Sequence, residues 1–132
     1  MKIEHVAINV KNPPEMAAWY VKHLGLKVVS KKEMAPFTHF LADDSGRVMI
    51  EFYNNPPDQV PDYANMDPLL LHFAFVSEDT QSDKDRLIEA GASFYAEVNP
   101  DKNSSLLMLR DPWGLAIQLC KRSKPLLEEK EL

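Results

Sequence analysis

The chain has 132 residues, of which 45% are hydrophobic and 27% are charged, and its formal net charge at pH 7 is -5. These values are typical of one soluble globular domain and exclude a wholly disordered or collagen-like chain. The acidic balance without a basic stripe argues against nucleic acids and anionic membrane surfaces as partners, and no segment is apolar for long enough to span a bilayer. Met1 leads into strand-like sequence instead of a signal peptide, so we expect a cytoplasmic protein with a small-molecule substrate.

The first part of the chain, residues 1–54, predicts a βαβββ module. Residues 2–10 alternate as a strand does, and Asn12-Pro13 offers an N-cap followed by a proline in the first helical turn. The helix that follows is expected to end at Gly25, because glycine suits the left-handed backbone after a helix. Three further strands are predicted near 26–32, 37–43 and 47–54.

The second part, residues 69–121, repeats the same order of elements. A strand is predicted at 69–77, followed by a helix near 80–90 that Gly91 ends. Three more strands are predicted near 92–98, 104–110 and 114–121.

A linker, residues 55–68, separates the two modules. It holds too many prolines for a strand or a long helix, namely Pro56, Pro57, Pro61 and Pro68. The sequence leaves open whether this linker closes over a site as a lid. The charged tail, residues 122–132, is assigned no function.

An internal repeat relates the two modules. A shift of 67 residues, from position 5 to position 72, brings two pairs of segments into register. The matched segments are 5–10 with 72–77 and 49–53 with 116–120. His5 then lies over His72, and Glu51 lies over Gln118. The sequence therefore predicts an α+β fold of two tandem βαβββ modules related by pseudo-two-fold symmetry.

The neighbours of each matched residue indicate which face of its sheet it occupies, because alternate strand residues face opposite sides. In all four strands the other face is apolar and is expected to pack under a helix. Its members are Val6, Ile8 and Val10 beside His5; Leu71, Phe73 and Phe75 beside His72; Val48, Ile50 and Phe52 beside Glu51; and Leu115, Ile117 and Leu119 beside Gln118. The four matched polar side chains should therefore lie off the helix-packing core.

If the two modules pair about an approximate two-fold axis, His5, Glu51, His72 and Gln118 meet at one point. Two imidazoles, one carboxylate and one amide oxygen suit one divalent ion of Ni, Co, Mn, Fe or Zn, with open positions for water or substrate oxygens. A lone strand histidine is more often structural, and Gln118 is the weakest ligand, so the matched placement is what favours a metal site.

Cys120 shares a face with Gln118 and is a candidate for lining the cavity. It is the single cysteine, which excludes an internal disulfide and a thiolate cluster, and nothing around it indicates an activated nucleophile. His23 and His39 have no mates in the other module, so structural or surface roles are expected for them.

Three motifs carry a family resemblance: the strand start at 5–10, the helix end Trp19-Tyr20-Val21-Lys22-His23-Leu24-Gly25-Leu26, and the turn Asp111-Pro112-Trp113-Gly114 before the last strand. With these, residues 2–121 resemble the vicinal oxygen chelate superfamily. This superfamily includes glyoxalase I, methylmalonyl-CoA epimerase, extradiol dioxygenases, and fosfomycin and bleomycin resistance proteins. The resemblance implies a single glyoxalase-like domain over residues 1–121, with mixed sheets curved around a cleft, and it is less specific for the reaction.

Bacterial glyoxalase I looks closest in ligand arrangement, with a histidine, a glutamate, a histidine and a glutamate at the four matched positions. Here Gln118 departs from that pattern. The resemblance implies a metal that binds two substrate oxygens and stabilises an enolate, with Glu51 as ligand and catalytic base. We therefore predict a metal-dependent lyase or isomerase that acts on a small oxygenated substrate.

Substrate recognition is implied less directly by the same resemblance. Asn55, four residues after Glu51, matches a contact of glyoxalase I with glutathione, whereas Asn9 stands where an arginine is expected. Asn9, Asn55 and Cys120 are the candidate substrate-binding residues.

Two other functions are alternatives. The first is a metal-free small-molecule binding protein of the bleomycin-resistance type, which the departure at Gln118 and the missing arginine favour. The second is an acyl thioester epimerase, which is disfavoured because its carboxylate typically lies on the last strand, the reverse of Glu51 and Gln118. A homodimer is expected, with modules that pair within one chain or between two.

Overall fold

The computed structural model describes residues 1–127, so the end of the predicted tail lies outside the described residues. The chain forms two compact units, Met1–Pro61 and Asp62–Leu132. The boundary between these units falls inside the predicted linker 55–68.

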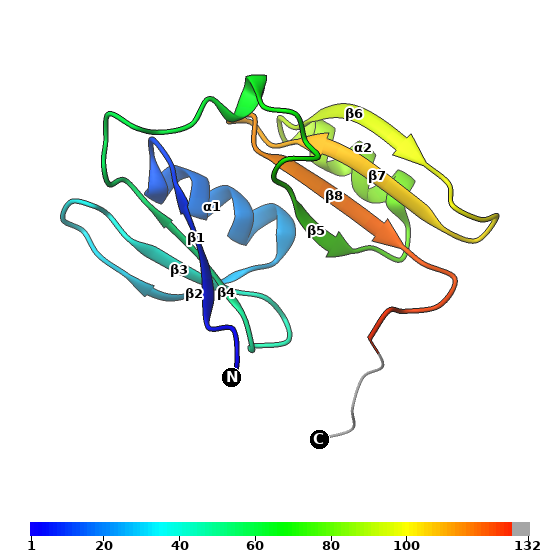
Figure 1. Ribbon diagram of the computed structural model, residues 1–132, viewed down its shortest axis with the longest axis horizontal. Helices are drawn as coiled ribbons and strands as arrows, with labels where there is room; N and C mark the ends of the chain where they lie inside the picture. Colours follow the sequence, from blue (N-terminus) through cyan, green and yellow to red (C-terminus); the bar gives the residue numbers. More distant parts are fainter. Residues whose placement is uncertain (128–132) are drawn as a thin grey trace. The chain divides into compact units, whose positions relative to one another are not determined.

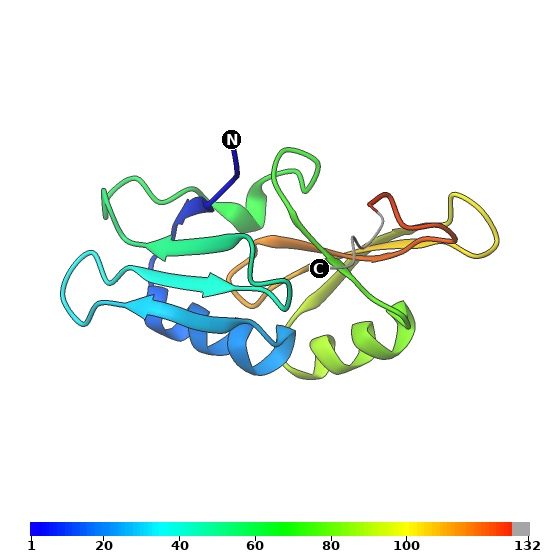
Figure 2. The same cartoon turned by 90° about the horizontal axis from the view of Figure 1, so that it is seen from below.

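The first unit is a βαβββ module (Figure 1). Its elements are β1 (His5–Asn9), α1 (Pro13–Leu24), β2 (Lys27–Lys31), β3 (His39–Ala42) and β4 (Met49–Tyr53). The strands form one sheet in the order β1-β4-β3-β2, in which β1 runs parallel to β4 and the other pairs are antiparallel. The helix α1 packs on β2, β3 and β4 and covers one face of this sheet (Figure 2).

The second unit repeats the module. After a short 3-10 turn, η1 (Tyr63–Asn65), come β5 (Phe73–Val76), α2 (Thr80–Glu89), β6 (Ser93–Val98), β7 (Ser105–Arg110) and β8 (Ala116–Lys121). The sheet order β5-β8-β7-β6 is that of the first unit, and β5 again runs parallel to β8. The predicted pair of βαβββ modules is confirmed.

The strand register shows the duplication at the level of single residues, because equivalent residues are paired in both sheets. In the first unit Ala7 of β1 lies opposite Glu51 of β4, and in the second Ala74 of β5 lies opposite Gln118 of β8. The antiparallel pairs β2–β3 and β6–β7 also have an irregular register at related places, between Val28 and Ser30 in β2 and between Phe94 and Ala96 in β6. Matching irregularities in both copies are expected if each βαβββ module descends from one unit.

Side-chain caps set the helix ends. The Asn12 side chain accepts a hydrogen bond from the Glu15 amide at 3.3 Å, and Gly25 takes the left-handed backbone, with φ 71°, as predicted. In the second unit the Asp79 side chain accepts from the Ser82 amide at 3.0 Å. That second cap was not predicted from the sequence.

The core of each unit lies between its helix and its sheet. In the first unit Tyr20 of α1 and Phe52 of β4 are fully buried, with ring centroids 5.1 Å apart. In the second unit the fully buried side chains include Leu87, Leu107 and Ile117. The predicted apolar face is therefore confirmed in part, because half of its residues are buried, namely Ile8, Val10, Phe52, Leu115, Ile117 and Leu119.

Two members of that predicted face, Val6 and Val48, are instead exposed, at 44% and 39%. The helix α1 packs mainly on β2, β3 and β4, whereas Val6 lies on the edge strand β1 and Val48 precedes β4. The alternation of the sequence identified the face correctly but not how far the helix covers it.

The predicted strand 69–77 is shorter in the structure. The Leu70 amide donates to the Asp67 carbonyl at 3.0 Å, and the Leu69 amide donates to the Asp67 side chain at 2.9 Å. These bonds form a turn, so β5 begins only at Phe73. His72 therefore precedes its strand by one residue, whereas His5 is the first residue of β1.

Among residues 1–127 no helix has the length and hydropathy to cross a membrane.

Candidate metal half-sites and an adjoining pocket

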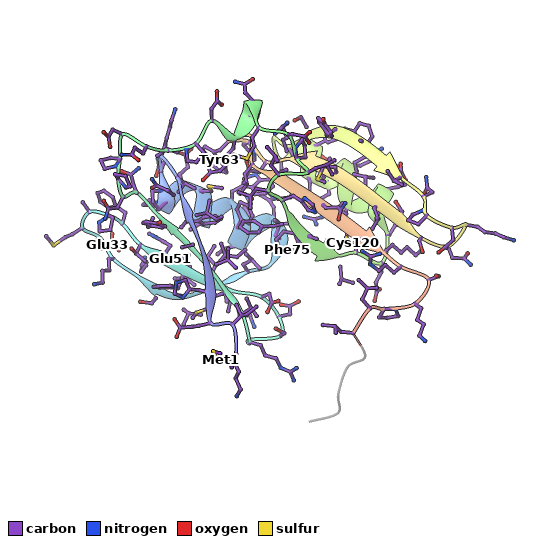
Figure 3. The ribbon with its side chains drawn as sticks, viewed as in Figure 1. Met1, Glu33, Glu51, Tyr63, Phe75 and Cys120 are labelled. Carbon is purple, nitrogen blue, oxygen red and sulfur yellow. The ribbon has the colours of Figure 1, made fainter. Side chains whose placement is uncertain are left out.

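The first half-site pairs His5 with Glu51. Ala7 lies opposite Glu51, and His5 lies two residues before Ala7, so His5 and Ala7 project to the same side of the sheet. His5 Nε2 lies 3.7 Å from Glu51 Oε1, and the Glu51 side chain is 17% exposed. An imidazole nitrogen and a shielded carboxylate oxygen thus lie side by side (Figure 3 labels Glu51).

The ring of His5 is oriented from its other side. Its Nδ1 lies 2.9 Å from Glu4 Oε1, and its ring meets Phe40 edge-on at a centroid distance of 5.3 Å. A carboxylate accepts hydrogen bonds, so Nδ1 carries the proton that is donated to Glu4. In the neutral ring Nε2 then keeps the lone pair that a metal requires.

The second half-site combines His72 and Gln118. His72 Nδ1 lies 2.8 Å from the Pro68 carbonyl oxygen, which can only accept, so Nε2 again keeps its lone pair. Gln118 lies on β8 opposite Ala74, and Ala74 follows His72 by two residues. His72 and Gln118 thus have the same register relative to each other as His5 and Glu51, although His72 lies one residue before its strand.

Gln118 differs from Glu51 in its contact within the sheet. The Cys120 thiol donates to Gln118 Oε1 at 3.2 Å, so the amide oxygen already accepts one hydrogen bond. Burial raises the pKa of the Cys120 thiol, and the positive charge of Arg122 partly opposes this rise. A raised pKa keeps the thiol protonated at neutral pH, which agrees with the expectation that Cys120 is not an activated nucleophile.

Donor chemistry at both half-sites fits a divalent transition metal. Each offers one imidazole nitrogen whose second nitrogen is held by an oxygen acceptor, together with one side-chain oxygen. Within residues 1–127 no group of three or more histidine, cysteine, aspartate or glutamate side chains gathers as a complete site. Each unit by itself offers two candidate ligands.

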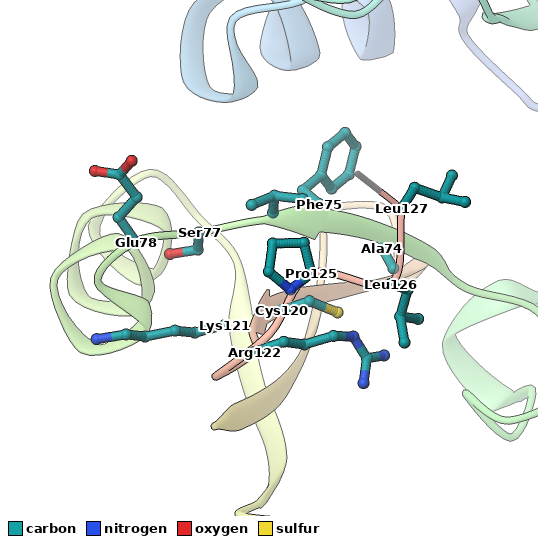
Figure 4. Close-up of a pocket in the computed structure, with 11 residues that line it drawn as sticks. Ala74, Phe75, Ser77, Glu78, Cys120, Lys121, Arg122, Pro125, Leu126 and Leu127 are labelled. Atoms are coloured by element: carbon teal, nitrogen blue, oxygen red, sulfur yellow. The ribbon is translucent and has the colours of Figure 1, made fainter. Parts of the chain in front are cut away.

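A pocket of about 420 Å³ adjoins the second half-site (Figure 4). Its lining comes from the end of β5, the end of β8 and the segment after β8. The lining residues are Ala74, Phe75, Val76, Ser77, Glu78, Cys120, Lys121, Arg122, Pro125, Leu126 and Leu127. Cys120 connects the pocket to Gln118 through its hydrogen bond, and its role in substrate binding stays a prediction.

A family model described as the Glyoxalase/Bleomycin resistance protein/Dioxygenase superfamily matches residues 2–119. The chain belongs to this superfamily.

Solved structures of the superfamily's fold are similar over nearly the whole chain. A glyoxalase family protein from Bacillus cereus has a TM-score of 0.76 and 19% identity, with 91% of this chain and 93% of that chain covered. TnmS3, an antibiotic binding protein from Streptomyces sp. CB03234, has a TM-score of 0.71 and 18% identity, with 93% and 97% covered. A glyoxalase family protein from Enterococcus faecalis has a TM-score of 0.69 and 26% identity, with 91% and 97% covered. A comparison with curated proteins finds no match.

Asn9, a candidate substrate-binding residue, holds a loop of this glyoxalase-superfamily module. Its Nδ2 donates to the carbonyls of Pro56 at 2.9 Å and Gln59 at 3.3 Å, and its Oδ1 accepts from the Asn55 amide at 2.8 Å. A substrate would have to compete with these bonds for the carboxamide. The substrate contacts of Asn9 and Asn55 stay predictions.

Arg110 is a site-organising residue that the sequence did not reveal. Its guanidinium donates to the carbonyls of Tyr63 and Met66, both at 2.8 Å, and of Gly114 at 3.1 Å. These bonds hold the segment 63–66 on the second unit, just before the Pro68 carbonyl that orients His72. The signal was weak, because a single arginine at a strand end indicates nothing specific about its partners.

Proposed function

We propose that this chain binds one divalent metal ion and acts as a lyase or isomerase of the glyoxalase I type on a small oxygenated substrate. The observation that carries the proposal is the pair of His5 Nε2 and Glu51 Oε1, 3.7 Å apart, with the opposite ring nitrogen held by Glu4. Carboxylate-oriented imidazoles of this kind are typical of metal-ligating histidines.

Four residues would hold the ion. His5 and His72 would each supply Nε2, Glu51 a carboxylate oxygen, and Gln118 its amide oxygen. The two halves of the site come from different units, so pairing of a first unit with a second, within one chain or between two copies, would complete it. A homodimer is also part of the proposal.

Glu51 is the residue we assign to proton transfer. When bound, the ion would supply Lewis acidity for two neighbouring substrate oxygens. Glu51 would take the proton from the substrate carbon beside them and return it to the adjacent carbon. Its low exposure limits access of water to this carboxylate.

A second candidate function is a metal-free small-molecule binding protein. The apolar pocket beside Gln118 favours it, as does the hydrogen bond that already occupies the Gln118 amide oxygen. The similar TnmS3 is described as an antibiotic binding protein, although that likeness concerns the fold. In this function Gln118 would not need to bind a metal.

Metal content separates the two candidates. We expect the chain, loaded with Ni, Co, Mn, Fe or Zn and then desalted, to keep about one equivalent by elemental analysis. His5→Ala and His72→Ala should each lower the affinity by about 10- to 100-fold or more, whereas His23→Gln should leave it unchanged because His23 stacks on Trp19 outside both half-sites. Less than about a tenth of an equivalent, without tight rebinding, would favour the metal-free protein.

Turnover tests the reaction class. The metal-loaded chain is expected to convert a hemithioacetal, and Glu51→Gln should lower kcat by about 100- to 10,000-fold, more than it lowers metal content. An acyl thioester epimerase would instead exchange deuterium at the α carbon of a 2-substituted acyl thioester. Such exchange without hemithioacetal turnover would overturn the glyoxalase assignment.

A further inference from the structure

Three of the most exposed apolar side chains in the second unit surround the pocket beside Gln118. Val76 is 92% exposed, Leu126 is 77% exposed and Leu127 is 86% exposed. Apolar side chains gathered around one concavity, rather than scattered singly, usually mark a place where a ligand or partner removes them from water.

The floor of the pocket continues the sheet face that carries Gln118. Val76 lies opposite Cys120 at the ends of the paired strands β5 and β8, just as Ala74 lies opposite Gln118. The segment after β8 then returns beside these strands and contributes Pro125, Leu126 and Leu127 (Figure 4). The volume of about 420 Å³ lies within the range of about 300–1,000 Å³ usual for small-molecule sites.

Charge at the rim is mainly positive. Lys121 and Arg122 line the pocket, against one carboxylate, that of Glu78. Among residues 1–127 no carboxylate lies within ion-pair distance of Arg122.

We propose that this pocket binds a small amphipathic monoanion, with its apolar ring or chain against Val76 and Leu127 and its carboxylate or sulfonate at Arg122. The inference rests on the proposed function in one respect, because Cys120 links the pocket to Gln118. The pocket would then take the apolar end of an anionic substrate. Arg122 would select for charge, and the exposed valine and leucines would select for an apolar body.

A matched pair of fluorescent dyes tests the proposal. The anionic dye is 8-anilinonaphthalene-1-sulfonate, and its neutral counterpart is N-phenyl-1-naphthylamine, which lacks the sulfonate. Both are titrated into the full chain in the presence of EDTA, so that the outcome does not depend on metal binding. We expect one saturable site for each dye and tighter binding of the anionic one.

Substitutions assign each part of the pocket. Arg122→Gln should lower the affinity for the anionic dye by about tenfold, as expected for the loss of one charge-assisted hydrogen bond. The affinity for the neutral dye should change by less than about twofold. Val76→Asp and Leu127→Asp should weaken both dyes, and both sites are exposed enough to accept aspartate without loss of the fold. Arg47→Gln, an exposed arginine of the first unit, is the matched control and should change neither.

Three outcomes would overturn the proposal. If Arg122→Gln weakens binding of the two dyes equally, Arg122 does not bind the anionic group. If Val76→Asp and Leu127→Asp leave dye binding unchanged, the dyes do not bind in this pocket. Dye affinity that falls as the protein concentration rises would assign the surface to a second copy of the chain. Failure of metal binding alone would overturn the proposed enzyme and leave this pocket standing.

Discussion

At the scale of single residues, the two histidines share an orientation although their acceptors differ. His5 donates from Nδ1 to the Glu4 carboxylate, and His72 donates from Nδ1 to the Pro68 carbonyl. Either acceptor leaves Nε2 as the nitrogen with a lone pair in the neutral ring.

Cys120 provides a test of the local electrostatics. Burial raises the pKa of its thiol, so the thiolate forms only at higher pH than in an unfolded chain. The rate of alkylation by iodoacetamide, followed against pH, should therefore have a higher midpoint in the folded protein than in guanidinium chloride. Arg122→Gln should move the midpoint further upward, because the positive charge of Arg122 favours the thiolate.

The corresponding stability effect has a definite sign. A thiol whose pKa is raised on folding stabilises the folded state while it is protonated, and this contribution is lost as pH rises through the folded pKa. A folded midpoint at or below the unfolded one would contradict the burial of Cys120.

At the scale of elements, the segment that leads into the second unit is fixed rather than free. Arg110 binds the carbonyls of Tyr63 and Met66, and Gly114 lies so close to η1 that an added Cβ would be 2.6 Å from Ala64. The sequence left open whether the linker is a lid. Its last part, residues 62–66, packs as a fixed part of the second unit.

Gly114→Ala tests this close approach. The φ of Gly114 is +92°, and the Ala64 backbone blocks the new methyl group, so strain and overpacking should together lower the free energy of unfolding by about 2–4 kcal/mol. Gly46→Ala is the matched control, because Gly46 has φ +65° with nothing within 4 Å and should cost only about 1–2 kcal/mol. Urea unfolding of both variants measures the difference, and equal losses would show that η1 does not pack against Gly114.

Element boundaries show how far the sequence alone could predict the fold. Alternation identified every strand, and Asn12 and Gly25 identified the ends of α1, because these signals depend on neighbouring residues. The start of β5 was missed because the turn at Asp67 depends on which carbonyls the local amides reach. The exposure of Val6 likewise depends on where the helix lies over the sheet.

At the scale of the whole molecule, each unit ends in an open edge strand. Within their own sheets β1 and β5 each pair on one side only, and Val6 and Val76 on these strands are exposed. Unpaired edges with exposed apolar side chains favour association.

We therefore expect a homodimer. Sedimentation at micromolar concentration should report about twice the chain mass of 15.1 kDa, and Val6→Lys, which places a charge on the edge strand β1, should weaken association. Val21→Lys, at an exposed valine of the helix α1, is the control for a charge added away from the sheet edges. A single 15 kDa species in the unsubstituted chain would contradict the homodimer.

The sequence by itself determined the two βαβββ modules, their shared register and the matched positions of His5, Glu51, His72 and Gln118. These features follow from the local alternation of apolar and polar residues and from the internal repeat, both of which can be recognised in the sequence alone. Only the tertiary structure decided that Arg110 holds the segment before His72, that Asn9 holds its own loop, and that the residues after β8 complete a pocket. These contacts join residues more than 40 positions apart, as with Arg110 and Tyr63 at a separation of 47, and no local pattern encodes which distant partner a side chain will meet.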